Sequence, residues 1–228
     1  MIDAEAQRRA VWQSVGYPPP ARGEPHWPPQ LVIAIAVALQ WLVPDRLSAG
    51  PRWLLPAIEA LVLLSLVLAS PQRLVEPHPR RRQIAITATA VASIANAVSL
   101  GLLCHNLFKH NPSDGHALIG AGALIWLTNI LIFSLWYWEL DRGGPGTRAA
   151  GRDEAPDFLF PQMTARELCP DWRPRFPDYV YVALTNAMAI SPTDAMPVSV
   201  RMKTVMGLQS LISLVTIGLV ISRAVNIL

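Results

Sequence analysis

The run from Val200 to Val225 limits the fold of this chain more than any other stretch. A helix of about 20 apolar residues crosses a bilayer, and this run reaches that length. Further apolar runs precede it, and their apolar residues are bunched together instead of recurring with the period of a soluble amphipathic helix. Charged residues make up only 15% of the chain, against roughly 25% in an ordinary soluble domain. The sequence therefore predicts a membrane protein.

We predict an all-α fold, a polytopic membrane helix bundle of about five spans. Four apolar runs predict the first four spans: Leu31–Val43 extended by its flanks up to Leu47, Trp53–Ala69, Ile84–Phe108 and Ala117–Trp138. Gly143-Gly144-Pro145 is expected to stop the fourth helix. The predicted domains are a polar, proline-rich N-terminal tail (1–29), a four-helix transmembrane region (30–140), a polar loop (141–177), and a hairpin with the final transmembrane helix (178–228). Within the loop, Asp157–Gln162 is an apolar patch that lies against either the membrane surface or the bundle.

The last domain opens with a helix-compatible stretch, Tyr179–Ile190, that is too short to cross a bilayer. A short helix, a polar turn and a full span form the layout of a re-entrant pore hairpin. We therefore expect residues 178–197 to be re-entrant, and the alternative is that they span as a sixth helix. The turn has two compatible interpretations. Ser191, Pro192 and Asp194 suit the start of a helix, and the same polar turn suits a cavity at membrane depth.

Polar residues of the hairpin and the last helix are the candidate pore lining. If a solute passes here, the expected lining is Thr185, Asn186, Ser191, Thr193 and Asp194, with the Asp194 carboxylate attracting cations. On the last helix, Gln209, Ser213 and Thr216 recur at offsets that place them on one face. Such a polar stripe faces either a pore or neighbouring helices, and the sequence leaves both alternatives open.

Other classes of function have little support in the sequence. Cys104 and the nearby histidines match no tight metal-ligand spacing, and we find no phosphate-binding loop or nucleophile elbow. We therefore expect no enzyme, no catalytic residue, no metal site and no cofactor. No basic helix or aromatic-basic surface indicates a nucleic-acid partner. Cys104 lies in an apolar run and Cys169 in a polar loop, so no structural disulfide is expected.

The stretch Asp178–Asp194, supported by Arg201, Gln209 and Ala224-Val225-Asn226, resembles the bacterial integral membrane family known as DUF1345. The resemblance covers the whole plan of four spans, a polar loop, a pore-helix-like segment and a final span. It groups the chain distantly with pore-loop cation channels and implies no agreed activity. The place of a potassium channel's filter, Ala189–Asp194, contains no glycine and has Pro192, so a potassium-type filter is not expected.

Two functions stay open at this point. The first is an oligomeric pore that conducts a small cation, in which several copies are needed because one hairpin cannot surround a pore. The alternative is a non-conducting membrane scaffold or a subunit of a larger complex, with other membrane subunits as partners. A water-accessible cavity along 185–194 favours the first, and dry packing favours the second. Only two of the 19 basic residues are lysines, Lys109 and Lys203, which suggests a GC-rich bacterial genome and a multi-pass protein of the bacterial plasma membrane.

The distribution of basic residues predicts the orientation in the membrane. Arginines crowd the tail, the loop before the third span and the loop after the fourth, whereas the opposite side holds few basic residues, Arg46, Arg52, Lys109 and Arg223. Because basic residues in short loops resist translocation, Arg80, Arg81 and Arg82 are predicted to lie in the cytoplasm, as is the N-terminus. A re-entrant hairpin would then enter from the cytoplasmic side, opposite to a potassium channel. Either the hairpin is inverted in this way, or residues 178–197 span as a sixth helix, and the charge pattern leaves both alternatives open.

Cysteine labelling in intact cells tests this orientation. In a background that lacks Cys104 and Cys169, Arg80→Cys should not react with a membrane-impermeant thiol reagent, because three adjacent arginines hold that loop inside. Lys109→Cys, on the predicted outer side, should react and serves as the matched control. Ready labelling at position 80 with none at position 109 would reverse the orientation.

Overall fold

The computed structural model describes residues 24–25, 27–41, 73–74, 79–108, 115–150, 155–165, 167–170, 172–188 and 194–225, most of which are helical. The principal helices are α2 (Trp27–Trp41), α4 (Pro79–Phe108), α5 (Gly115–Leu140), α8 (Phe176–Met188) and α9 (Val200–Val225). The short elements are β1 (Glu24–Pro25), β2 (Arg73–Leu74), η3 (Asp141–Gly143), α6 (Pro145–Ala149), β3 (Phe158–Leu159), α7 (Pro161–Thr164) and β4 (Met196–Pro197). Strand β1 pairs antiparallel with β2, and β3 with β4.

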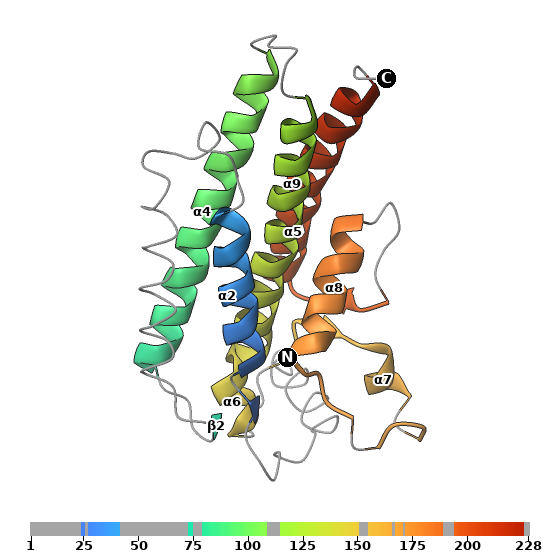
Figure 1. Cartoon of the computed structure of the whole chain (residues 1–228). Helices are drawn as coiled ribbons and strands as arrows, with labels where there is room; N and C mark the ends of the chain where they lie inside the picture. Colours follow the sequence, from blue (N-terminus) through green and yellow to red (C-terminus); the bar gives the residue numbers. More distant parts are fainter. Residues whose placement is uncertain are drawn as a thin grey trace, which may run out of the picture.

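Helix α5 is the centre of the bundle, and α2, α4, α8 and α9 all pack on it (Figure 1). A helix that is apolar on every side is buried, and α5 fits this rule, with Ile125, Ile132 and Phe133 each no more than 4% exposed. The outer helices keep apolar side chains at the surface, among them Ile94 of α4 and Leu214 of α9. Apolar surfaces of this kind suit contact with lipid.

Within the described residues, α4, α5 and α9 are long and apolar enough to cross a membrane, whereas α2 has a shorter apolar part, Trp27–Ala36. The third, fourth and last predicted runs are therefore confirmed as long apolar helices. The second predicted run, Trp53–Ala69, lies outside the described residues, so the count of about five spans stays a prediction. Helix α2 begins at Trp27, inside the predicted tail, whose residues up to position 23 also lie outside the described part.

Helices α8 and α9 begin at the same end of the bundle, which we call the base: α5 ends there, and α4 begins there (Figure 1). After α8, the chain is back at the base by β4, where Met196 pairs with Leu159 of β3. At about 1.5 Å per residue, the 13 residues of α8 extend half as far as the 26 residues of α9.

The interpretation of Ser191, Pro192 and Asp194 as a helix start is wrong. Asp194 is non-helical, and α9 begins only at Val200, after β4. The cap comes from Ser199, whose Oγ accepts a hydrogen bond from the backbone N–H of Met202 at 3.1 Å. Strand pairing at the base thus overrides the local preference of the turn. Ser191 and Thr193 lie outside the described residues.

The end of α5 confirms the predicted stop at Gly143-Gly144-Pro145. Gly143 and Gly144 have positive φ angles of 75° and 96°, and Arg142 also enters the left-handed region at φ 52°. A Cβ at position 144 would lie 3.0 Å from the carbonyl oxygen of Glu139, so glycine is required there for space as well as for φ. This turn reverses the chain and starts the segment that covers the base.

That segment is part of the core. Phe158, Phe160 and Met163 are each no more than 4% exposed and belong to the same hydrophobic cluster as Trp138 and Tyr179. The rings of Phe160 and Tyr179 meet edge-on with centroids 5.8 Å apart. Of the two placements expected for the apolar patch at 157–162, the structure shows contact with the bundle.

Gly122 permits the close approach of α5 and α9, and this generates a stability test. A Cβ at position 122 would overlap Cγ2 of Val220, whereas a Cβ at Gly120 would meet no atom within 4 Å. We expect Gly122→Leu to lower the free energy of unfolding in detergent by about 1–3 kcal/mol, the usual cost of overpacking. Gly120→Leu should not lower it, because the new side chain meets no atom and replaces a glycine inside a helix, a gain in helix propensity that both variants share. Equal effects of the two substitutions would contradict the close contact.

Candidate functional site around α8

Helix α8 is held by one face. Its buried residues recur three and four positions apart, as on one side of a helix: Phe176, Tyr179, Val182, Ala183, Asn186 and Ala187. This face lies against α5 and α9. Its two polar side chains, Tyr179 and Asn186, are seven residues apart, and each is a member of a separate buried polar cluster.

The first, which we call the amide cluster, consists of Asn129, Tyr137, Asn186, Gln209 and Ser213. Gln209 of α9 is its centre and is fully buried. Its Oε1 accepts hydrogen bonds from the hydroxyl of Tyr137 and from Nδ2 of Asn186, the latter at 2.8 Å. Its Nε2 donates to the carbonyl oxygen of Ala183 on α8 at 2.8 Å. One amide side chain therefore joins α5, α8 and α9.

The other amides complete these contacts. Asn186 Nδ2 also donates to the carbonyl oxygen of Met206 at 3.0 Å, and its Oδ1 accepts from the hydroxyl of Ser210 at 3.1 Å. Asn129 of α5 donates to Oγ of Ser213 at 2.9 Å. Polar side chains inside a membrane bundle commonly join helices in this way, because a polar group without a partner is costly in an apolar medium.

The structure separates the predicted pore-lining residues into three groups. Asn186, Gln209 and Ser213 come together in the amide cluster, and Thr216 is buried farther along the same face of α9. Thr185 is half-buried and donates to the carbonyl oxygen of Tyr181 on its own helix at 2.8 Å. Asp194 is exposed near the base. In the single chain, the polar stripe of α9 faces neighbouring helices, which is the packing alternative.

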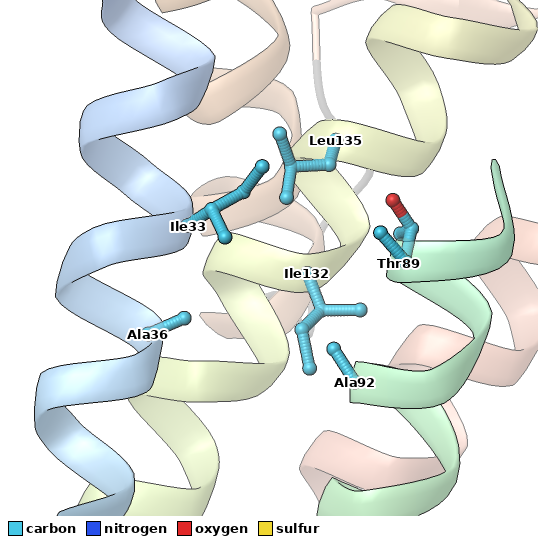
Figure 2. Close-up of a pocket in the computed structure, with 7 residues that line it drawn as sticks. Ile33, Ala36, Thr89, Ala92, Ile132 and Leu135 are labelled. Carbon is cyan, nitrogen blue, oxygen red and sulfur yellow. The ribbon is translucent and has the colours of Figure 1, made fainter. Parts of the chain in front are cut away.

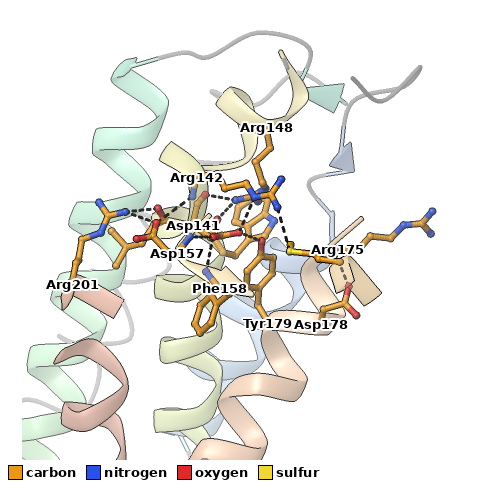
Figure 3. Close-up of polar contacts among 12 residues, drawn as sticks. Asp141, Arg142, Arg148, Asp157, Phe158, Arg175, Asp178, Tyr179 and Arg201 are labelled. Carbon is orange, nitrogen blue, oxygen red and sulfur yellow. Dashed lines mark hydrogen bonds and ion pairs between the residues drawn. The ribbon is translucent and has the colours of Figure 1, made fainter. Parts of the chain in front are cut away.

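The second buried polar cluster, which we call the base cluster, consists of Asp141, Arg148, Asp157, Tyr179 and Arg201 (Figure 3). Asp141 is fully buried. Its Oδ1 accepts from the backbone N–H groups of Asp157 and Phe158 at 2.9 and 3.3 Å, and its Oδ2 accepts from the hydroxyl of Tyr179 at 2.6 Å. These three donors satisfy the hydrogen-bonding capacity of a carboxylate that has no access to water.

Arg148 closes the end of α5. Its Nη1 donates to the carbonyl oxygens of Trp138 and Asp141 at 2.8 and 2.7 Å, so it binds carbonyls at the helix terminus. Its guanidinium also lies over the rings of Tyr179 and Trp138, 5.4 and 5.9 Å from their centroids. A cation over an aromatic face is attracted by the negative face of the ring.

Arg201 attaches the start of α9 to the same cluster. Its Nη2 lies 2.6 Å from Oδ2 of Asp157 and 2.9 Å from the carbonyl oxygen of Leu140. The Arg201 side chain is 48% exposed, so solvent screens this ion pair and reduces its contribution to stability. Near the start of α8, burial raises the pKa of the Asp178 carboxyl, and the hydrogen bond from the backbone N–H of Arg175 opposes that shift.

Sequence reasoning missed most of the base cluster. Asp141 stands three residues after the predicted fourth span, and Asp157 is the first residue of the predicted apolar patch. Each position marks an acid at the border of a buried segment, which is a usable signal. No spacing rule indicates that these two carboxylates and Tyr179 meet. Asn129 and Tyr137 are polar residues within the predicted fourth span, but the sequence does not indicate which residues of α9 they contact.

The hydrogen bonds of the two clusters hold α8 in position. Within the described part of the chain, no three His, Cys, Asp or Glu residues gather as a metal-ligand group. Cys104 and Cys169 are free thiols. The hydrogen bonds of Asp141 and Gln209 end on other side chains and on backbone groups of this chain. Together they fix α8 near both of its ends.

Comparison of this chain with known protein families, with curated proteins and with solved structures gives no match. Function is therefore inferred from the placement of α8 and from the chemistry of the residues around it.

A pair of tyrosines tests the base cluster. Tyr179 is fully buried and donates to Asp141, whereas Tyr181 on the same helix is 52% exposed. Tyr179→Phe removes a hydrogen bond to a buried charge, so we expect it to lower the free energy of unfolding in detergent by about 1.5–3 kcal/mol. Tyr181→Phe should change it by less than about 0.5 kcal/mol. A negligible effect of Tyr179→Phe would show that Asp141 does not need this donor.

Proposed function

We propose that this protein is a subunit of an oligomeric membrane channel of the pore-loop type that conducts a small cation. The observation that carries the proposal is the path of the chain around α8. A helix of 13 residues starts at the base, the chain is back at the base by β4, and the long helix α9 starts there. A half-length helix followed by a return to the same side is the layout of a re-entrant pore hairpin.

The direction of α8 supports a cation as the solute. The carboxyl end of a helix carries a partial negative charge, and the carboxyl end of α8 points away from the base and stands about halfway along the bundle, on its outer side (Figure 1). Half-helices aimed at a pore create electrostatic preference of this kind. The sequence that follows α8 supplies polar residues, Ser191, Thr193 and the acid Asp194.

An exposed face of α9 supports assembly of several copies. Leu208, Leu211 and Leu214 are each more than half exposed. Gly207 and Gly218 have open space where a Cβ would stand. Small residues among large apolar ones allow membrane helices of separate copies to approach closely. The resemblance of the hairpin to the DUF1345 family favours the same architecture.

A non-conducting scaffold is the second candidate, and the amide cluster favours it. Asn186, Gln209 and Ser213 bond to one another or to neighbouring backbone, and each is at most 9% exposed. Dry packing of this kind joins helices without offering a water path. In this alternative the same fold holds together a larger membrane complex and passes nothing.

Ion flux from liposomes separates the two candidates. The purified full-length protein is reconstituted, and potassium, sodium and proton flux are measured under an applied voltage. The channel proposal expects cation flux, with anions excluded. Well-folded wild-type protein that passes no ion at any voltage would overturn it and favour the scaffold.

Asp194→Asn gives a sharper test in the same liposomes. Asp194 is exposed, and Glu167→Gln removes an exposed acid from a different segment, so it is the matched control. One unit charge acting over a few ångströms in water is worth about 1 kcal/mol, so Asp194→Asn should lower cation flux about fivefold at low salt. The difference should shrink near 1 M salt, where screening extends only about 3 Å. Equal flux for both variants at low salt would exclude Asp194 from the pathway.

A further inference from the structure

The outward side of α9 carries a continuous stripe of exposed residues, which we call the outer seam. Its members follow one another at steps of four and three positions, from the first residue of the helix to the last. They are Val200, Thr204, Gly207, Leu211, Leu214, Gly218, Ile221 and Val225. The buried residues of α9, such as Met206 and Gln209, stand on the opposite side. A strict seven-residue repeat of this kind lets two helices stay in contact along their whole length.

Two glycines of the outer seam leave space that the described part of the chain does not use. A Cβ at Gly207 or Gly218 would meet none of its atoms within 4 Å. Gly122 differs, because Cγ2 of Val220 on α9 stands close to the place of its missing Cβ. Glycine weakens a helix relative to alanine, and small residues in membrane helices allow another helix to approach closely. The open space in the seam therefore suits a further helix that runs beside α9.

The apolar run Trp53–Ala69 lies outside the described residues and is the first occupant to consider. Its 17 residues extend about 26 Å as a helix, whereas the 26 residues of α9 extend about 39 Å. The run is therefore too short to cover the whole seam. It also ends four positions before Arg73 of β2, and β2 lies at the base beside β1 and α6 (Figure 1).

Helix α2 precedes that run and α4 follows β2, and both pack on a different side of α5 from α9. Ile132 and Leu135 of α5 face α2 and α4 (Figure 2). Asn129 of α5 instead donates to Oγ of Ser213 on α9. Six residues separate Asn129 from Leu135, which turns the two side chains about 120° apart around the helix. The run thus begins and ends on the side of α2 and α4, so a second copy of the chain is better placed to cover the seam.

The seam also suits a second copy in symmetry and charge. Copies insert in one orientation, so their α9 helices are parallel, and an axis perpendicular to the membrane brings identical seams together. The charged residues of α9 stand near its ends: Arg201, Lys203 and Arg223. Arg201 binds Asp157. In parallel helices a flanking residue faces the position five places further along its neighbour, so Lys203 meets a leucine, the residue at position 208.

We propose that neighbouring copies of this protein bind each other through the outer seams of their α9 helices, packed in parallel. This inference rests on the assembly of several copies in the proposed function, and it does not require that ions pass. Ser210, which flanks the seam, donates to Oδ1 of Asn186 on α8 at 3.1 Å, so α8 stands directly beside the contact. The contact therefore brings the hairpin segments of neighbouring copies together, as a pathway formed by several copies requires.

Disulfide cross-linking of the full-length protein in liposomes tests this contact. In a background that lacks Cys104 and Cys169, a single cysteine can form a disulfide only between copies. Leu214→Cys, in the seam, should cross-link on mild oxidation. Ile94→Cys is the matched control, because Ile94 is 65% exposed and stands 15 residue steps from the start of α4, as Leu214 stands 14 from the start of α9. The control should cross-link about tenfold more slowly, since only random collisions bring its thiols together.

A pair of glycines tests the close approach of the helices. Gly207→Leu places a large side chain in the seam and should raise the dissociation constant of the oligomer about tenfold. Gly101→Leu adds the same atoms to α4, also where a Cβ has open space, and should leave the constant unchanged. Dissociation is followed by single-molecule photobleaching as the liposomes are diluted with lipid. The midpoint of thermal unfolding in detergent confirms that each variant folds, and Gly218→Leu replaces Gly207→Leu if that variant does not.

The results separate this contact from the proposed function. Oligomers that form without a cross-link in Leu214→Cys would overturn the α9 contact and leave the channel to assemble through another surface. Equal cross-linking of Leu214→Cys and Ile94→Cys, or equal dissociation constants for Gly207→Leu and Gly101→Leu, would also overturn it. A wild-type protein that stays monomeric at every dilution would overturn both the contact and the oligomeric channel. A cross-linked protein that passes no ion would support the contact and favour the scaffold.

Discussion

The carboxylate of Asp141 is the interaction on which the base of this protein depends. A charge that is wholly buried must be paired and hydrogen-bonded, because its transfer from water is otherwise prohibitive. Asp141 meets that requirement with backbone N–H groups at the start of β3 and with the hydroxyl of Tyr179 on α8. The end of α5, the start of β3 and α8 are thereby joined by one side chain.

The amide cluster completes the restraint at the other end of α8. Tyr179 and Asn186 are seven residues apart on one face. The partner of Tyr179 is Asp141 in η3, and the partners of Asn186 lie on α5 and α9. A short helix that is held near both ends behaves as a rigid part of the bundle. In a channel this rigidity would fix the carboxyl end of α8 relative to a pore. In a scaffold it would present a constant surface to a partner.

The lengths of the apolar runs in the sequence were enough to predict the long helices. The run Val200–Val225 became α9 with the same bounds, and Gly143-Gly144-Pro145 ended the fourth helix as expected. Contacts that depend on the path of the chain had no such signal. Asp141 and Asp157 are 16 positions apart. Asp141 accepts a hydrogen bond from the backbone N–H of Asp157, and Asp157 accepts one from the backbone N–H of Arg142, a pair of contacts that neither helical nor strand periodicity encodes. The turn before α9 failed as a helix start because pairing of β4 with β3 was invisible in the local sequence.

The dependence of α8 on α9 has a consequence for the order in which the chain assembles during synthesis. Asn186 leaves the ribosome before Gln209, and Asp157 leaves before Arg201. Until the last helix has been made, the amide of Asn186 lacks its partners on α9, and β3 lacks β4. Helices α4 and α5 can pair early because they are neighbours in sequence. The base and α8 are therefore completed last, and a nascent chain that stops before α9 leaves them unfinished.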